Sequence, residues 1–281
     1  MDILSDIQGL KHYLSTFNQH EKSIGFVPTM GALHEGHLEL VSASKQQNDI
    51  TICSIFVNPT QFNNPEDLDK YPRDIPLDVA KLKNLFCDAV FIPSVKDMYG
   101  EDHVLKISFG YLEEVMEGKF RPGHFSGVGL IVTKLFNLIK PTRAYFGTKD
   151  LQQLTIIKKL TKDLLFDIEI VPVETVREPD GLAMSSRNKL LSKEERKHAT
   201  DLYNSLIMAR EKLNNQQSVI SVKKYISDFF DTNSAIDLEY FEVVNTENLH
   251  IVSKIHKLDK VSLCIAGYLG KVRLIDNISL N

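Results

Sequence analysis

Apolar and polar positions alternate in two distinct ways along the first two thirds of the chain. Short apolar runs predict buried strands at 24–27, 50–57, 89–92, 143–146 and 168–173. Between them, apolar residues recur at helical spacing over 78–86, 127–140 and 151–164. Strands that alternate with helices predict an α/β fold, with a Rossmann-like parallel sheet and helices on both of its faces.

The pattern changes after about residue 176. Ser192 and Glu195 have the spacing of a capping box, which predicts the start of a helix. Another helix follows, and then strands are predicted near 236–244, 261–268 and 271–276. We therefore expect a Rossmann-like domain over residues 1–175 and a smaller C-terminal α+β domain over residues 176–281.

Composition is that of a soluble globular protein. The chain has 281 residues, 43% hydrophobic and 25% charged, and a formal net charge of −4, which offers no broad attraction for nucleic acid. The amino terminus lacks a basic region followed by an apolar core, and no run of eighteen apolar residues occurs. Cys53, Cys87 and Cys264 are scattered in apolar surroundings, which indicates reduced core thiols. We expect a cytoplasmic protein with no membrane partner.

Candidate chemistry gathers where strands lead into helices, because ligands of parallel sheets bind beyond the carboxyl ends of the strands. The first apolar run stops at Pro28 and a new periodicity begins at Leu38, so His34 and His37 lie at such a junction. A helix amino terminus favours anions, and histidines three residues apart can reach one phosphate. Half of a zinc site and ordinary helix capping are the alternatives that this segment leaves open.

A second candidate segment follows the next predicted strand. Its amides, Asn58 and Gln61, can hydrogen-bond a small polar ligand, although a plain turn explains them equally well. The sequence Asn64-Pro-Glu66 is typical of a helix start. Arg121 and His124, which precede another predicted helix, offer an anion contact or a loop that ends in a helix cap.

The third and fourth segments add cationic and hydroxyl groups. Lys149 lies beside a predicted helix start, and Asp150 can accept a hydrogen bond from a ribose hydroxyl. Asp150 and Gln153 also have capping-box spacing, so helix initiation alone would account for them. The segment Gly181–Asn188 offers two hydroxyls and the Arg187 guanidinium to a polyphosphate, or is a simple polar turn.

Together these segments resemble, in order and spacing, the motifs of the pantothenate synthetase family, also called pantoate–β-alanine ligases. The matching stretches are Met30–His37, Phe56–Phe62, Gly147–Asp150 with Gln152 and Gln153, and Met184–Asn188. The resemblance covers nearly the whole chain, including Val272–Asn277, although the helices around 200–235 carry little of it. The family belongs to the adenylate-forming nucleotidyltransferases, whose HIGH-type and KMSKS-type signatures correspond here to His34–His37 and Met184–Arg187.

The resemblance implies an AMP-forming ligase of pantothenate biosynthesis, the route to coenzyme A. ATP and pantoate would form pantoyl adenylate and pyrophosphate, and the amine of β-alanine would then displace AMP. A homodimer and Mg²⁺ are also implied. The family's magnesium contact lies in the acidic stretch after Tyr71-Pro-Arg73, where this chain has Asp74 and Asp78 with Leu77 between them. That spacing does not identify a protein ligand of the metal.

The resemblance also implies roles for individual residues. It assigns catalysis to His34, His37 and Lys149, with His37 as proton donor, pantoate to Gln61 and Gln153, and β-alanine to Gln61. The residues implied for ATP are Met30, Gly31, Ala32, Leu33, His34, Glu35, Gly36, His37, Gly147, Thr148, Lys149, Asp150, Val176, Met184, Ser185, Ser186 and Arg187. Val176 would contact adenine through its backbone. The C-terminal domain would close over the site about a hinge at Pro179–Gly181.

Three other classes of protein share part of this pattern. A class I aminoacyl-tRNA synthetase has both signatures, but this chain lacks room for its further modules and has no basic surplus. A nucleotidyltransferase acting on a phosphate ester would use the histidines without the Gln61 segment. A nucleotide-binding module without catalysis would bind ATP and not turn it over.

Overall fold

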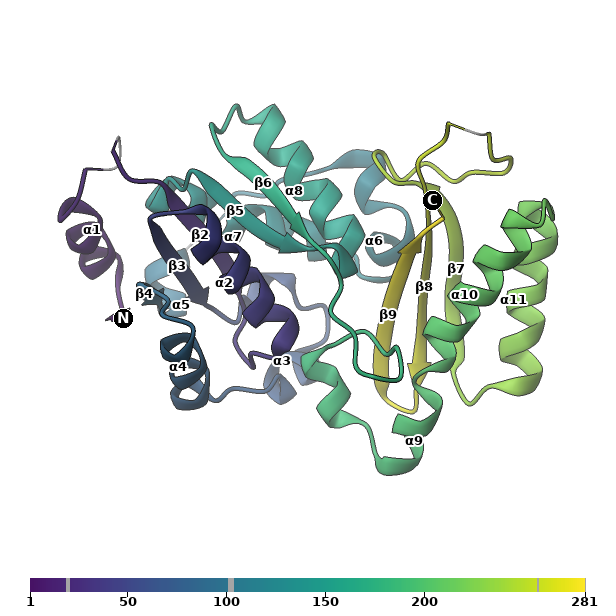
Figure 1. Cartoon of the computed structure of the whole chain (residues 1–281). Helices are drawn as coiled ribbons and strands as arrows, with labels where there is room; N and C mark the ends of the chain where they lie inside the picture. Colours follow the sequence, from purple (N-terminus) through teal and green to yellow (C-terminus); the bar gives the residue numbers. More distant parts are fainter. Residues whose placement is uncertain (19–20, 101–103, 257, 281) are drawn as a thin grey trace. The chain divides into compact units, whose positions relative to one another are not determined.

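The computed structural model describes residues 1–18, 21–100, 104–256 and 258–280. The chain forms two compact units, shown in Figure 1. The first comprises Met1–Thr148 and Ile156–Glu174, and the second comprises Lys149–Thr155 and Thr175–Asn281. In the described part of the chain, no helix has both the length and the apolar character needed to cross a membrane.

The first unit contains a six-stranded parallel sheet. Its strands are β1 (Asp2–Leu4), β2 (Ile24–Thr29), β3 (Ile50–Ile55), β4 (Ala89–Phe91), β5 (Arg143–Gly147) and β6 (Glu169–Val173). Their order across the sheet is β1-β4-β3-β2-β5-β6. The five strands expected from apolar runs are confirmed. The three-residue β1 was not expected, because its apolar run is too short to give a signal.

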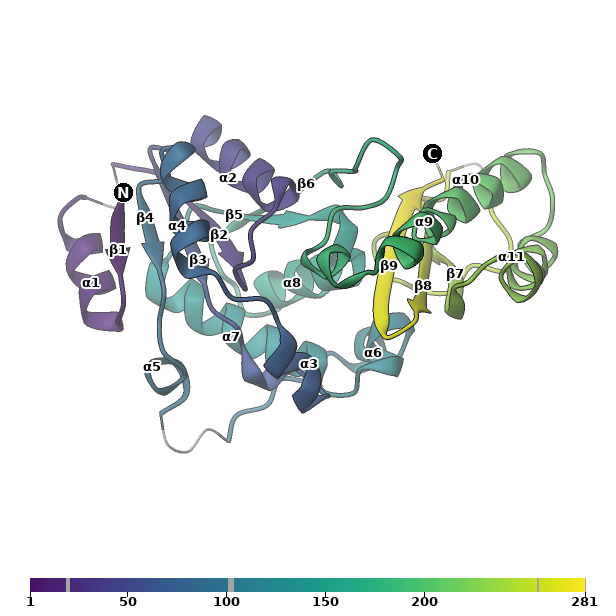
Figure 2. The same ribbon diagram turned by 90° about the horizontal axis from the view of Figure 1, so that it is seen from below.

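Helices cover both faces of this sheet, as the sequence predicts (Figures 1 and 2). Val27 of β2 shares a buried cluster with Val41 and Leu82 on one face. On the other face the Phe26 ring meets the Phe136 ring edge-on, with centroids 6.4 Å apart. The helices are α1 (Ile7–Ser15), α2 (Glu35–Gln47), α3 (Pro65–Lys70), α4 (Ile75–Asn84), α5 (Val95–Tyr99), α6 (Met116–Phe120), α7 (His124–Ile139) and α8 (Leu151–Asp163). Helix α8 begins in the second unit and ends in the first.

The strand order reverses beside β2. From β2 the chain proceeds to β3 and β4 on one side, whereas β5 and β6 lie on the other side. Such a reversal opens a crevice at the carboxyl ends of the central strands, where ligands of α/β sheets bind. Strand β2 ends at Thr29, directly before the segment Met30–His37. The topology therefore puts the most distinctive sequence motif at the position best suited to a ligand.

The second unit is α+β, as expected. Its antiparallel sheet has the order β7-β8-β9, and three helices precede these strands in the chain. The elements are α9 (Lys193–His198), α10 (Asp201–Asn214), α11 (Val219–Asn233), β7 (Asp237–Asn245), β8 (Val261–Leu269) and β9 (Val272–Ser279). The capping box that opens α9 is confirmed, since the Ser192 N–H donates to Glu195 Oε2 at 2.7 Å and the Glu195 N–H to Ser192 Oγ at 3.2 Å. Leu206, Val222 and Ile265 lie in one buried core cluster.

Candidate active site

A left-handed turn connects β2 to α2. Gly31 has φ +79° and Ala32 has φ +50°, and the Gly31 N–H donates to Thr29 Oγ1 at 3.2 Å. A side chain at Gly31 would be strained by this φ, and its Cβ would lie 3.0 Å from both Asp78 and Ile55. The turn brings the backbone close to α4, so the positive φ favours glycine here and the space beside it is tight.

Helix α4 holds this turn through a buried carboxylate. Asp78 is 1% exposed, and its two oxygens accept the N–H groups of Ala32 and Leu33, each at 2.8 Å. From the same helix, Lys81 Nζ donates to the Leu33 carbonyl at 2.5 Å. The Leu33 peptide is therefore held on both its donor and its acceptor side. Residue spacing alone did not reveal this role of Asp78.

The two histidines lie at the amino terminus of α2. His34 is the N-cap residue, with extended backbone, and its N–H donates to His37 Nδ1 at 3.4 Å. The imidazole centroids are 4.0 Å apart, with the ring planes inclined at 35°. A neutral imidazole that accepts at Nδ1 carries its proton on Nε2. The site thus combines the positive end of a helix with two adjacent rings, an arrangement suited to an anion.

Gln61 lies beside the same turn. It belongs to the short 3₁₀ turn η1 (Pro59–Gln61), is 7% exposed, and its Nε2 lies 3.1 Å from Met30 Sδ. Asn58 Nδ2 donates to Gln61 Oε1 at 3.0 Å and also to the Gly127 carbonyl at 3.1 Å. The predicted polar loop is therefore an ordered turn that fixes one amide next to Met30.

Two neighbouring segments have structural roles. The side chain of Asn64 accepts from the Glu66 N–H at 2.9 Å, so this segment begins α3, as its sequence suggests. His124 Nδ1 lies 2.7 Å from the Gln61 carbonyl, and Arg121 lies 3.2 Å from His124 Nε2. His124, in the first turn of α7, therefore supports the Gln61 turn, and Arg121, directly after α6, contacts the His124 ring.

The sequence-predicted site divides between the two units. Lys149 is in the 3₁₀ turn η3 (Thr148–Asp150), which runs directly into α8, and its carbonyl accepts from Asn277 Nδ2 at 2.6 Å. Gln153, in the first turn of α8, is partly exposed, whereas Gln152 is 3% exposed. In the first unit, the structure brings His34, His37, Met30 and Gln61 to the carboxyl end of β2. In the second unit, the hydrogen bond from Asn277 connects the backbone of Lys149 to β9.

The segment Val176–Met184 is a short hairpin, which the sequence did not predict. The Met184 N–H donates to the Val176 carbonyl at 3.0 Å, and Arg177 pairs with Ala183 across the hairpin. Beyond it, Ser185 caps the 3₁₀ turn η4 (Ser186–Leu190) by accepting the Arg187 N–H at 3.2 Å. Ser185, Ser186 and Arg187 of the KMSKS-type segment therefore come directly after a hydrogen-bonded hairpin in the chain.

A buried ion pair anchors the base of this hairpin. Arg177 donates to both oxygens of Asp276, at 2.6 and 3.0 Å, and its guanidinium stacks 4.0 Å above the Tyr203 ring. Burial raises the pKa of the Asp276 carboxyl, and Arg177 opposes that shift. Asp276 and Asn277 belong to a stretch that only the family resemblance singled out, because no local pattern marks them.

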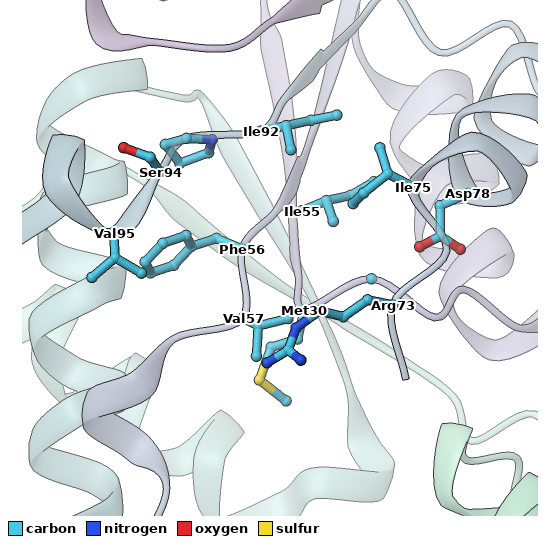
Figure 3. A pocket seen from close by; sticks show the side chains of 12 residues that line it. Met30, Ile55, Phe56, Val57, Arg73, Ile75, Asp78, Ile92, Ser94 and Val95 are labelled. Carbon is cyan, nitrogen blue, oxygen red and sulfur yellow. The ribbon is translucent and has the colours of Figure 1, made fainter. Parts of the chain in front are cut away.

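A cavity of about 250 Å³ lies beside the Met30 turn, whose Met30 and Gly31 belong to its lining (Figure 3). It is lined by Met30, Gly31, Ile55, Phe56, Val57, Arg73, Ile75, Asp78, Ile92, Pro93, Ser94 and Val95. Most of these side chains are apolar, and the Asp78 carboxylate is occupied by backbone N–H groups. Met30 and Gly31 are among the residues implied for ATP, whereas neither histidine nor Gln61 lines this cavity.

Metal ligands do not cluster at the site. Among residues 1–18, 21–100, 104–256 and 258–280, no three His, Cys, Asp or Glu side chains form a group able to hold a metal ion. Asp74 caps α4 by accepting the Leu77 N–H at 3.0 Å, and Asp78 holds the Met30 turn. Cys53, Cys87 and Cys264 are buried thiols that form no disulfide.

Comparison with known proteins gives a consistent result over the full length. A family model described as pantoate-beta-alanine ligase matches residues 2–279. A pantothenate synthetase from Caldicellulosiruptor bescii is 50% identical over 279 residues, covering 99% of this chain and 98% of that protein. The crystal structure of pantothenate synthetase from Thermus thermophilus has a TM-score of 0.93 at 39% identity, covering 100% of this chain and 99% of that one.

A further solved structure was crystallised with ligands. Pantoate-beta-alanine ligase from Francisella tularensis, complexed with beta-gamma ATP and beta-alanine, has a TM-score of 0.83 at 37% identity. The match covers 100% of this chain and 98% of that one.

Proposed function

The chain belongs to the pantoate–β-alanine ligase family and joins pantoate to β-alanine at the expense of ATP, and from this premise we propose which residues carry each step. The products are pantothenate, AMP and pyrophosphate, through a pantoyl-adenylate intermediate. The observation that carries the assignment of residues is the histidine pair, with ring centroids 4.0 Å apart at the amino terminus of α2 and at the reversal of strand order.

In the first step, a carboxylate oxygen of pantoate attacks the α-phosphorus of ATP and pyrophosphate leaves. Negative charge approaches negative charge, so hydrogen-bond donors and cations must stabilise the transition state. We assign this task to His34, His37 and Lys149. Because His37 accepts at Nδ1, its neutral ring presents Nε2–H to the leaving pyrophosphate, which supports a role as donor.

The remaining ATP contacts follow the two signature segments. The backbone from Met30 to Gly36 lines the positive end of α2, and Gly147 to Asp150 lead into α8. Ser185, Ser186 and Arg187 supply hydroxyls and a guanidinium for the phosphates. The hairpin that begins at Val176 supports an adenine contact through its backbone.

Pantoate is assigned to Gln61 and Gln153, whose amides match its hydroxyls and carboxylate. The fixed orientation of Gln61, bonded to Asn58 and adjacent to Met30, supports this role. In the second step the amine of β-alanine attacks the acyl carbon of the adenylate and AMP leaves. We assign β-alanine to Gln61 too, and the related Francisella tularensis enzyme was crystallised with beta-alanine.

The acyl adenylate is sensitive to water, so the site must be covered during turnover. We propose that residues 1–175 bind nucleotide and pantoate, and that the C-terminal domain, residues 176–281, closes over the site about a hinge at Pro179–Gly181. Left-handed Gly181, with φ +94°, supports a turn at that point.

Magnesium would accompany ATP. The residues present do not form a protein cage for it, because Asp78 accepts two backbone N–H groups and Asp74 caps a helix. Mg²⁺ is commonly held by phosphate oxygens and water with few protein ligands, which suits this donor set. When bound, it would neutralise charge on the phosphates.

We also propose a cytoplasmic homodimer. Three buried cysteines that form no disulfide, Cys53, Cys87 and Cys264, suit a reducing compartment. Val104 and Leu105, which are 91% and 61% exposed, offer apolar surface to a second copy. Sedimentation analysis of the purified protein tests the dimer.

Substitution of Lys149 tests the proposed mechanism. We expect Lys149→Ala to slow pyrophosphate formation from ATP and pantoate by roughly two or more orders of magnitude, the range seen when a transition-state donor is removed. Single-turnover measurement of pyrophosphate gives the rate directly, and Lys159→Ala, an exposed site on α8, is the control. Near-normal turnover of Lys149→Ala would remove this residue from the mechanism.

A further inference from the structure

The end of β9 contacts two segments that the proposed function places at the phosphates of ATP. Asn277 Nδ2 donates to the carbonyl oxygen of Lys149 at 2.6 Å. The preceding residue, Asp276, receives two hydrogen bonds from Arg177, at the base of the hairpin that leads to the KMSKS-type segment. One contacted residue, Lys149, has a proposed catalytic role, and the other, Arg177, follows Val176, which has a proposed role in ATP binding.

We propose that Asp276 and Asn277 are positioning residues for adenylate formation. Asn277 fixes the peptide of Lys149, and Asp276 fixes Arg177 and, through it, the hairpin before Met184–Arg187. This inference rests on the proposed role of Lys149. Neither Asp276 nor Asn277 is assigned a contact with the reacting atoms, so both act through the segments that they hold.

The geometry at Asn277 favours a positioning role. The lysine side chain has four rotatable methylenes, so the place of its ammonium group depends on a fixed backbone. Lys149 lies in the short 3₁₀ turn η3 between β5 and α8. The side-chain amide of Asn277, which donates to the Lys149 carbonyl, restrains the backbone at this point.

The geometry at Asp276 is consistent with the same role. Its side chain is 3% exposed and would be costly to bury without partners, and the bidentate pair with Arg177 supplies them. Arg177 also donates to the carbonyls of Gly181, at 3.0 Å, and Asn277, at 3.2 Å. One guanidinium therefore connects the end of β9 to the turn of the hairpin.

Small displacements matter in such a site. A shift of about 1 Å in a reacting group can cost roughly a hundredfold in rate. Neighbouring residues of one strand hold Lys149 and the hairpin. Loosening the Asn277 contact should therefore slow the chemical step, and loosening the Asp276 contact should weaken ATP binding, while the Gln61 side of the pantoate site stays intact.

A double-mutant cycle tests the Asn277 contact. Asn277→Leu keeps the approximate size of the side chain and removes the donor. We expect it to lower kcat for pyrophosphate formation by at least about tenfold, with KM for pantoate unchanged within about twofold. In a Lys149→Ala background the same substitution should have almost no further effect, because the group that it positions is gone.

The matched control is Asn245→Leu. Asn245 also ends a strand of this sheet and bonds the backbone, accepting the Glu247 N–H at 2.9 Å. The Asn245→Leu substitution should change the melting temperature without changing kcat. Equal losses of kcat in the two single variants, or a full additional loss from Asn277→Leu on top of Lys149→Ala, would overturn the positioning role.

Asp276→Asn tests the second contact independently. Loss of the bidentate pair should raise KM for ATP by at least about tenfold, since the hairpin carries the ATP segment, and the folded variant should retain its KM for pantoate. An unchanged KM for ATP in folded protein would overturn this half of the proposal. Wild-type protein that released no pyrophosphate with pantoate would reject the proposed function together with the positioning role, whereas active wild-type protein with an additive cycle would reject only the latter.

Discussion

Two buried carboxylates hold the backbone next to the proposed phosphate contacts. Asp78 accepts two N–H groups of the Met30 turn, and Asp276 accepts two from the Arg177 guanidinium. Burying a charge costs free energy unless hydrogen bonds replace its hydration, and in both cases each oxygen has a donor. The hydrogen bonds of each carboxylate therefore offset its desolvation and at the same time fix the position of the group that donates them.

Replacement of Asp78 should loosen the Met30 turn. In Asp78→Asn, one of the two backbone N–H groups would face the amide nitrogen, so a buried donor would lose its acceptor. We expect the free energy of unfolding to fall by about 1–3 kcal/mol and KM for ATP to rise. Urea denaturation and steady-state kinetics measure the two effects.

Asp88→Asn is a matched control for this prediction. Asp88 accepts the Thr51 N–H at 2.7 Å, at the amino end of β3 and away from the turn. The Asp88→Asn substitution should lower the free energy of unfolding and leave KM for ATP unchanged. If Asp78→Asn behaved in the same way, the turn would not depend on its carboxylate.

Residue-scale prediction from the sequence worked where the signal is local. The spacing of His34 and His37, and the change of period around them, located both residues correctly at a strand-to-helix junction. Asp78 bonds residues 46 and 45 positions away, and Asn277 bonds one 128 positions away. No pattern within a short window contains such partners, so these roles could be found only in the folded structure.

At the scale of elements, α7 and the Gln61 turn approach each other unusually closely. A Cβ on Gly127 would lie 2.4 Å from the Thr60 carbonyl oxygen and 2.8 Å from the Gln61 nitrogen. Both are backbone atoms, which cannot rotate away. The helix therefore fixes the turn by contact as well as by the hydrogen bonds from Asn58 and His124.

Gly127→Ala should displace that turn. We expect KM for pantoate to rise by roughly tenfold, with a smaller change in KM for ATP, because Gln61 moves while the histidines stay. Gly129→Ala is the control on the same helix, since its Cβ would meet the Phe109 ring, a side chain that can move. Equal effects of the two substitutions on KM for pantoate would contradict the proposed position of Gln61.

Elements with a strong period were predictable, and those built from backbone pairing were not. Five strands of the parallel sheet, the three C-terminal strands and the capping box at Ser192 follow from apolar pattern and spacing. Strand β1 and the Val176–Met184 hairpin carry too few periodic positions. Their conformations depend on backbone pairing, of β1 with β4 and of Arg177 with Ala183, which no local sequence pattern indicates.

At the scale of the whole molecule, each unit has its own core. The chain passes from one unit to the other after Thr148, Thr155 and Glu174. Buried thiols lie in both units, Cys53 and Cys87 in the first and Cys264 in the second. They report separately on the integrity of each core, since a buried thiol reacts only when its surroundings open.

We expect none of the three thiols to react with iodoacetamide at about pH 8 while the protein is folded, and all three to react in urea. Burial raises the pKa of Cys87 to about 11 and that of Cys53 well above its usual value, so little thiolate forms. Because the unfolded state loses the Cys87 proton near pH 9, this thiol makes stability fall as pH rises from about 9 to 11. Mass spectrometry of labelled protein counts the modified residues; rapid labelling of Cys87 in folded protein would contradict the burial.

The whole molecule activates pantoate with ATP and transfers the acyl group to β-alanine. The direct measurement is pyrophosphate release from ATP, magnesium and pantoate, with and without β-alanine, while AMP and pantothenate are followed. We predict a burst of pyrophosphate, at most one per site, with pantoate alone, and sustained release with equal amounts of AMP and pantothenate when β-alanine is present. No pyrophosphate release with pantoate in either case would contradict this activity.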